Sequence, residues 1–330
     1  MNPKLKGWLL MLLRVAISGA LLWWVVQRME GDLDALRRVS IIELVPAAIV
    51  FTVSTVLGAL QWTLILRHAG MDVSPGRLHA LYWVGMFFNN FLPSNVGGDL
   101  VKVADVSMTT GRVARPIAGT LLDRALGLSA LAALAFVAGA LLREHAPAGL
   151  PWWALTAVAV PVIAGTGAIL SGRAGRLLTL LVDRLRPGPG RGRLRQLLGV
   201  LQDYRSHPRF VLRIAALALL VQAMRVSTHV LVTRAMGLSL EPERILQLYV
   251  LVPVLALAVV LPISFNGLGV RELVAQRLMP AIGISAESAV AMQLITYFVQ
   301  VTVSLIGGVV FAVMMIRGQL RMRRGDPEGI

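Results

Sequence analysis

Six apolar runs, each about as long as a membrane-crossing helix, occupy much of this sequence. They lie near residues 8–27, 41–66, 117–142, 152–170, 211–233 and 287–316. A helix of roughly 20 apolar residues crosses the ~30 Å hydrocarbon core of a bilayer. In lipid the backbone must satisfy its own hydrogen bonds, and unbroken runs of this length do so as helices rather than as barrel strands. The sequence therefore predicts an all-α polytopic membrane protein with about six full spans.

The composition supports a membrane protein, and the placement of the charges argues against a nucleic-acid-binding protein. Hydrophobic residues make up 56% of the chain, and its mean hydropathy is +0.73. A soluble domain could not bury that much apolar surface. The net charge of +15 is high enough for a nucleic-acid binder, but the arginines lie between the apolar runs, where they act as orientation signals. We therefore expect membrane lipids as partners and no nucleic acid.

Loop charges predict the orientation of the chain. The segment 171–213 carries ten arginines against two aspartates, which is typical of a cytoplasmic loop. The basic residues near the N-terminus and in the tail predict that both termini are cytoplasmic as well. The loops at 28–38 and 143–151 have nearly balanced charge and suit the outside. The run at 8–27 is too long for a cleaved signal, so we expect it to remain as the first span.

Two further apolar segments, 78–110 and 245–280, are interrupted by similar motifs. The first breaks at LPSNVGGD (92–99) and the second at LPISFNGLGVRE (261–272). To keep the loop charges on their expected sides, each segment must enter and leave the membrane on one side, the first from the cytoplasm and the second from outside. Such a matched pair predicts re-entrant helical hairpins in an inverted repeat, with a site near the midplane. Two ordinary kinked helices are the alternative.

These elements predict two membrane halves. We expect the first over 1–170, a basic cytoplasmic loop over 171–210, the second half over 211–316, and a basic cytoplasmic tail over 317–330. The basic loop has two interpretations. It is either a topology determinant in contact with anionic lipids or a docking surface for a partner enzyme, such as one that synthesises a lipid.

Polar side chains within the apolar segments predict the position of a substrate path. Arg225 lies near the centre of its run, where an arginine costs roughly 2.5–3.5 kcal/mol and needs a partner in the bundle interior. The remaining candidates lie at the two breaks and in the run at 117–142. The predicted path residues are Asn90, Pro93, Asn95, Gly97, Gly98, Asp99, Lys102, Asp123, Arg124, Arg225, Pro262, Asn266, Gly267, Gly269, Arg271 and Glu272.

We expect the three acids and three arginines of this set, Asp99, Asp123, Glu272, Arg124, Arg225 and Arg271, to converge inside the bundle. For the neighbours Asp123 and Arg124, a purely structural salt bridge is the alternative. A secondary lining is predicted from polar residues that share faces of the spans: Gln61, Gln222, His229, Gln293, Tyr297 and Gln300. Hydrogen bonds that hold the helices together would explain the glutamines equally well.

The sequence offers no motif for a cofactor or a catalytic nucleophile. GGDLVK at 97–102 lacks the Gly-Lys-Ser/Thr end of a phosphate-binding loop, and the chain has no cysteine and no metal-ligand spacing of histidines. We therefore expect no metal, no cofactor and no catalytic residue.

Three of these motifs together resemble the lysylphosphatidylglycerol synthase transmembrane family, also called flippase-like. They are FFNNFLPSNVGGDLVKV at 87–103, the pair Asp123-Arg124, and LPISFNGLGVREL at 261–273. The resemblance covers about residues 8–316 and implies movement of a lipid between the leaflets of a bacterial plasma (inner) membrane. It places the family's motif positions on Asn90, Pro93, Gly97, Gly98, Asp99, Pro262, Gly267, Gly269 and Glu272.

The soluble aminoacyltransferase half of two-part relatives is absent from this sequence, so we expect no aminoacyl-lipid synthesis. The lipid stays open among aminoacyl-phospholipid, glycolipid and polyprenyl types. Three alternatives to a flippase are a small-solute transporter, a polyprenyl-linked glycosyltransferase or other lipid-modifying enzyme, and an accessory subunit with no transport of its own. The enzyme alternative rests on Asp32 and Asp34 in the first outer loop.

Overall fold

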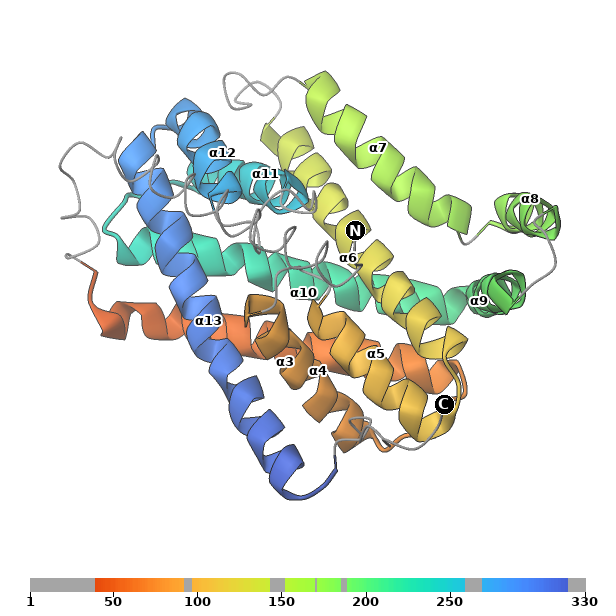
Figure 1. Cartoon of the computed structure of the whole chain (residues 1–330). Coiled ribbons are helices and arrows are strands. Elements are labelled where there is room, and N and C mark those ends of the chain that lie inside the picture. Colours follow the sequence, from red (N-terminus) through yellow and green to blue (C-terminus); the bar gives the residue numbers. More distant parts are fainter. Residues whose placement is uncertain are drawn as a thin grey trace, which may run out of the picture.

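The computed structural model describes residues 39–91, 97–142, 152–169, 171–184, 189–258 and 269–319. Over these ranges the chain is helical and contains no strand (Figure 1). The helices are α3 (Val45–His68), α4 (Pro75–Phe91), α5 (Gly97–Thr110), α6 (Ala114–Leu142), α7 (Trp152–Ile169), α8 (Gly172–Asp183), α9 (Pro189–Arg205), α10 (Pro208–Ala235), α11 (Pro242–Ala258), α12 (Val270–Leu278) and α13 (Ala286–Ile316), with 3₁₀ turns at Ile41–Leu44 and Met279–Ile282.

Among the described residues, four helices are long and apolar enough to cross a membrane: Ile41–His68, Ala114–Leu142, Pro208–Ala235 and Ala286–Ile316. They coincide with four of the six expected spans. The run at 152–170 forms α7, which has Pro161 in its interior and contains the apolar stretch Ala159–Ala168. The run at 8–27 lies outside the described residues, as does most of the tail.

The surface of α3 shows why a bilayer is the natural solvent. Ile49, Val53, Val56, Leu60 and Leu64 recur every three or four residues, and all five side chains are exposed. They form a single apolar stripe along the helix, which acyl chains can solvate and water cannot. The opposite face of α3 packs into the protein. The chain is therefore a multi-pass membrane protein, as the sequence predicts.

The order of helix lengths occurs twice along the chain. Helices α3 to α6 have 24, 17, 14 and 29 residues, and α10 to α13 have 28, 17, 9 and 31. After α3 and after α10 the chain turns at a glycine with positive φ, Gly70 or Gly237. Helices often end at a residue in the left-handed conformation, which glycine adopts without strain because it has no Cβ. The next helix begins five residues later in both cases, at Pro75 or Pro242.

The packing partners repeat as well. Helix α4 of the first set lies against α13 of the second, and α11 of the second lies against α6 of the first. Helices α3 and α10 pack together and run side by side in opposite directions (Figure 1). The hydroxyl of Tyr204, just before α10, donates a hydrogen bond to the carbonyl of Ile65 near the end of α3, at 3.0 Å. The two sets of four helices therefore start from opposite ends of the bundle.

Helices α4 and α5 form a tight antiparallel hairpin. Near its open end, Arg77 of α4 pairs with Asp105 of α5, with 2.8 Å between Nη2 and Oδ1. Near its closed end, a Cβ atom added at Gly98 would overlap the backbone carbonyl of Gly85. The two backbones therefore touch directly, which small residues permit in membrane helices. Gly98 of the Gly-Gly pair in the first motif makes this contact.

Two apolar clusters lie toward opposite ends of α10. One packs the end of α3, the start of α6 and α9 around Trp62, Leu122 and Ile214. The other packs α11, α12 and the start of α13 around Val232 and Leu251. The polar residues of α10 that the sequence singles out lie between these clusters.

The contact between Gly98 and Gly85 can be tested with an alanine. We expect Gly98→Ala to lower the thermal unfolding midpoint of the purified protein in detergent, because overpacking in a rigid interior costs about 1–3 kcal/mol. Gly165→Ala on α7 is the matched control, since its Cβ would meet open space. That substitution should leave the midpoint unchanged or raise it slightly through helix propensity. Equal midpoints for the two variants would contradict the close approach.

Candidate functional site

A buried ionic cluster lies where the α4–α5 hairpin meets α6. Asp99, in the first turn of α5, is only 5% exposed. Its Oδ1 lies 2.9 Å from Nζ of Lys102, and its Oδ2 lies 2.7 Å from Nη2 of Arg124. A buried carboxylate is tolerated only when such partners replace its hydration. Asp99 thus joins the hairpin to a full span.

The start of α5 holds Asp99 in place. The amide N–H of Gly98 donates a hydrogen bond to Oδ1 of Asn89 at 2.8 Å, so a side chain from the end of α4 satisfies one of the free amides of the helix. A carboxylate in the first turn of a helix is also stabilised by the aligned peptide dipoles. The neighbouring Asn90 bonds within α4, where Nδ2 donates to the carbonyl of Met86 at 3.4 Å.

Two aromatic rings accompany the ammonium group of Lys102. Its Nζ lies 4.7 Å from the ring centroid of Trp62 and 4.7 Å from that of Tyr82. Trp62 is itself fixed, because its Nε1 donates a hydrogen bond to Oγ1 of Thr120 at 3.0 Å. Cation–π attraction strengthens when water is excluded, and Lys102 is 4% exposed. The lysine is therefore held between a carboxylate and two ring faces.

Asp123 and Arg124 are adjacent in sequence but turn to different partners. Arg124 reaches Asp99, whereas Oδ1 of Asp123 accepts a hydrogen bond from Nε2 of Gln61 at 2.8 Å. The side chain of Arg124 remains 48% exposed although it lies about three turns inside α6. An arginine that is both paired and accessible at this depth suits a wet cavity better than contact with acyl chains.

Arg225 faces the bundle interior, as the sequence predicts, and extends the cluster to α10. Its Nη2 lies 3.4 Å from the hydroxyl of Tyr82, and its buried Nε has no hydrogen-bond partner within the described ranges. On the same helix, Nδ1 of His229 lies 3.2 Å from the Arg225 carbonyl, and the Gln222 amide packs against Gly127 of α6. Arg225 thus keeps hydrogen-bonding capacity that the described protein groups leave unused.

A second ionic group begins α12. Oε2 of Glu272 accepts a hydrogen bond from the N–H of Gly269 at 2.7 Å, and its Oε1 accepts one from Nε of Arg271 at 2.9 Å. The Arg271 guanidinium lies 4.1 Å from the ring centroid of Tyr297 on α13. Glu272 is fully buried. Like Asp99, it is an acid in the first turn of the helix that follows a break.

The contacts of the described residues join the predicted residues into two groups. Asp99, Lys102, Asp123, Arg124 and Arg225 form a continuous set with Gln61, whereas Arg271, Glu272 and Tyr297 form another. His229 lies within electrostatic reach of Arg271 and adjoins both groups. Gln293 is buried and Gln300 half-buried on α13. The predicted residues Pro93, Asn95, Pro262, Asn266 and Gly267 lie outside the described residues, as do Asp32 and Asp34.

Sequence reasoning missed four residues that the geometry requires. Trp62 and Tyr82 supply the ring faces, Asn89 caps α5, and Gly85 admits the backbone of Gly98. Aromatic residues are common in apolar runs, so nothing in their spacing marked these two as partners of a lysine. Asn89 stands beside the predicted Asn90, and only the geometry separates their roles. Within the described ranges, no three histidine or acidic side chains gather as metal ligands would.

The buried Glu272 can be tested against a matched acid. Glu287 also lies in the first turn of a helix, α13, but it is only half-buried. We expect Glu272→Gln to destabilise the protein by about 3 kcal/mol, because disrupting one partner of a buried ion pair leaves the other charge without compensation. Glu287→Gln should have little effect. Thermal unfolding midpoints at one scan rate check this, and equal midpoints would show that the Arg271 pair contributes little.

Comparison with known proteins agrees with these motifs. The sequence model of the lysylphosphatidylglycerol synthase TM region matches residues 11–308. UPF0104 membrane protein PH1989 of Pyrococcus horikoshii is similar, with 27% identity over 125 residues. That match covers 37% of this chain and 37% of the relative, so it spans little more than a third of the relative's length. No solved structure matches significantly. Because the family match covers most of this chain, the chain belongs to the lysylphosphatidylglycerol synthase TM region family.

Proposed function

We propose that this protein moves a polar-headed lipid between the two leaflets of the membrane, with the head group crossing at the Asp99 cluster. The observation that carries the proposal is the buried carboxylate of Asp99 inside a membrane protein. Lys102 and Arg124 pair with it, and the side chain of Arg124 remains accessible. Ionic groups at such depth are costly and mark transport paths. The acyl chains would remain in the bilayer while the head group passes.

The arrangement of the two helix sets supports an inverted repeat. Helices α3 and α10 run antiparallel, so α4–α5 and α11–α12 enter the bundle from opposite ends (Figure 1). We propose that each pair is a re-entrant hairpin and that their breaks meet near the midplane. In transporters built this way, the N-terminal ends of broken helices face the substrate. Asp99 and Glu272 occupy such positions.

The charges favour a head group that contains phosphate. The first group has three cations, Lys102, Arg124 and Arg225, against the acids Asp99 and Asp123, and the Arg225 Nε has no described hydrogen-bond partner. Guanidinium groups bind phosphate oxygens through strong charge-assisted hydrogen bonds. A lipid phosphate could therefore satisfy Arg225 and compete with Asp99 for Arg124. This agrees with an aminoacyl-phospholipid or polyprenyl-phosphate better than with an uncharged glycolipid.

The family match supports a lipid-related role, because its description names the membrane region of a lipid synthase. We propose a transporter rather than an enzyme, placed in a bacterial plasma membrane with its arginine-rich end and both termini in the cytoplasm. The driving force would be an ion gradient, the membrane potential or the lipid gradient itself. A small-solute transporter can be distinguished from a lipid transporter by experiment, because it would not change the distribution of a lipid between the leaflets.

Removal of the Asp99 charge tests the proposal. In proteoliposomes that contain a fluorescent phospholipid reporter, we expect Asp99→Asn to slow transfer between leaflets at least tenfold, because Lys102 and Arg124 lose the carboxylate between them. Asp105→Asn is the matched control. Asp105 lies on the same helix, is equally buried and pairs with Arg77, but it lies outside the cluster. It should keep most of the wild-type rate.

Two outcomes would contradict the proposal. Equal transfer rates for both variants, with both folded by thermal unfolding, would remove Asp99 from the path. Failure of the wild-type protein to accelerate transfer of phospholipid, polyprenyl-phosphate or glycolipid reporters above protein-free vesicles would remove lipid transport itself. In that case, uptake of a labelled solute by the same vesicles would favour the solute transporter.

A further inference from the structure

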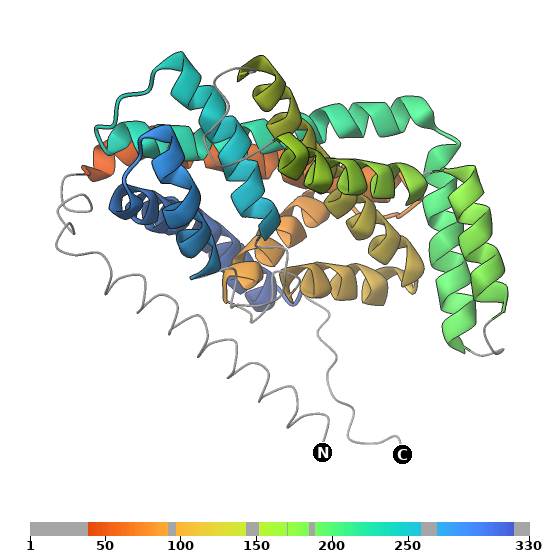
Figure 2. The same cartoon turned by 90° about the horizontal axis from the view of Figure 1, so that it is seen from above.

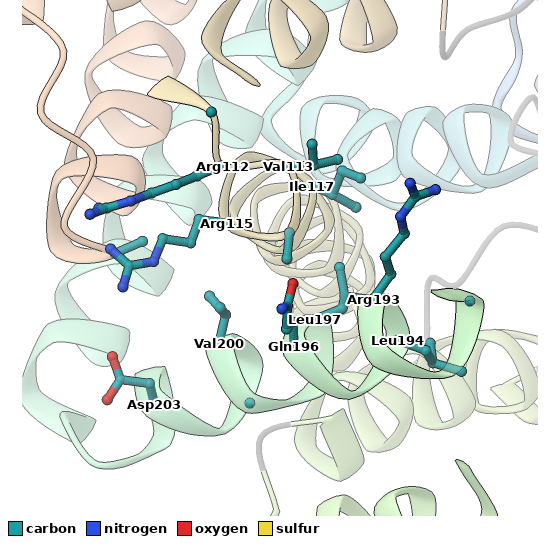
Figure 3. A pocket seen from close by; sticks show the side chains of 15 residues that line it. Arg112, Val113, Arg115, Ile117, Arg193, Leu194, Gln196, Leu197, Val200 and Asp203 are labelled. Atoms are coloured by element: carbon teal, nitrogen blue, oxygen red, sulfur yellow. The ribbon is translucent and has the colours of Figure 1, made fainter. Parts of the chain in front are cut away.

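A cavity of about 1220 Å³ lies at the corner where α5 leads into α6, about two helical turns before Arg124, and none of its lining residues belongs to the Asp99 cluster. The corner forms one wall, and α9 forms the opposite wall (Figure 3). Arg112 and Arg115 extend from the corner, Arg193 rises from α9 on the other side, and Gln196 points into the space between them. The lining of this cavity therefore combines cationic groups from two separate elements.

The two corner arginines lack an acidic partner. Nη1 of Arg112 and Nη1 of Arg115 both donate to the carbonyl of Gly70, at 3.0 and 3.3 Å. Neither forms an ion pair within the described ranges, and Asp203 is the one acid among the lining residues. Two guanidinium groups that share one neutral acceptor repel each other and keep most of their N–H donors unused. An anion between them would relieve the repulsion and accept those donors.

The rest of the lining is apolar. Val113 and Ile117 come from the α6 side, and Leu197 and Val200 come from α9. The cavity also lies at the start of α6, where free backbone amides and the helix dipole favour negative charge. A cationic rim over an apolar wall fits a lipid phosphate with part of its glycerol and acyl chain. A free anion would leave the apolar wall without a partner.

The α8–α9 hairpin places this cavity at the level of the membrane surface. Helices α8 and α9 lie across the direction of α3 and α10: Figure 1 shows α8 and α9 end-on, and Figure 2 shows them lengthwise beside the start of α10. Leu177, Leu180 and Leu181 share one face of α8 and are 59%, 61% and 49% exposed. A helix with an exposed apolar face and neighbouring arginines that lies across the spans is typical of one at the interface of a bilayer.

From these observations we infer that the cavity between the α5–α6 corner and α9 binds the phosphate head group of an anionic lipid from the adjacent leaflet. Arg112 and Arg115 contact the phosphate, and the α6 and α9 side chains contact the lipid body, with Arg193 at the other end of the cavity. Because this site is separate from the Asp99 cluster, the inference does not depend on lipid transport.

Binding of short-chain lipids to the purified full-length protein in uncharged detergent tests this site. The probes are dioctanoyl phosphatidylglycerol, dioctanoyl phosphatidylcholine and glycerol 1-phosphate, and the shift of the unfolding midpoint with concentration gives each affinity. We expect phosphatidylglycerol to bind at least tenfold more tightly than the other two. The double variant Arg112→Gln with Arg115→Gln should weaken phosphatidylglycerol binding at least tenfold.

Two controls separate this site from general charge and from the proposed transport path. Arg173→Gln with Arg176→Gln removes the same charge from α8, outside the cavity, and should bind as the wild type does. Asp99→Asn should also retain binding. If the corner variant does not fold, the single variant Arg112→Gln, at an exposed position, replaces it, with an expected loss of at least threefold.

The inference would be wrong if the corner and α8 variants bound phosphatidylglycerol equally, or if phosphatidylcholine bound as tightly as phosphatidylglycerol. Equal affinity for glycerol 1-phosphate would assign the cavity to soluble phosphate compounds and overturn the lipid assignment.

Discussion

The cost of placing charge in an apolar medium governs the centre of this protein. Asp99 can be buried only because Lys102 and Arg124 approach its two oxygens within 3 Å. Those partners come from the same hairpin and from a neighbouring span, so the ion pairs also fix how the hairpin sits against α6. Lys102 brings Trp62 and Tyr82 to the same point, and Tyr82 brings Arg225. A single carboxylate therefore sets the positions of side chains from five helices.

The sequence predicts the spans well because their physical cause is local. Run length and hydropathy within a segment are enough to define α3, α6, α10 and α13. The depth of Arg225 likewise follows from its position in a run. The partners do not follow, because they depend on packing between distant segments. The pairing of Asp123 with Gln61 and the contact of Gly98 with Gly85 arise only when α3, α4, α5 and α6 assemble.

Direct contacts link the three acids and three arginines as two groups, for a geometric reason. Glu272 caps its own helix and pairs with the adjacent Arg271, so both charges are compensated locally. Asp99 has no such neighbour on its N-terminal side and takes partners from Lys102 and α6 instead. Similar motifs thus give different ion pairs in the two halves. Glu272 pairs within its own helix, whereas Asp99 also pairs with a neighbouring span.

The glycine contacts of α4 determine which parts of the molecule can shift separately. Its backbone touches α5 at Gly98 and α13 at Gly307, without side chains between them to slide or repack. Helices α4, α5 and α13 are therefore expected to move as one rigid body. The salt bridge between Asp99 and Arg124 crosses the contact between this rigid body and α6, here called the seam. Opening the seam would strip both charges of their partner, unless an arriving head group took over that role at the same moment.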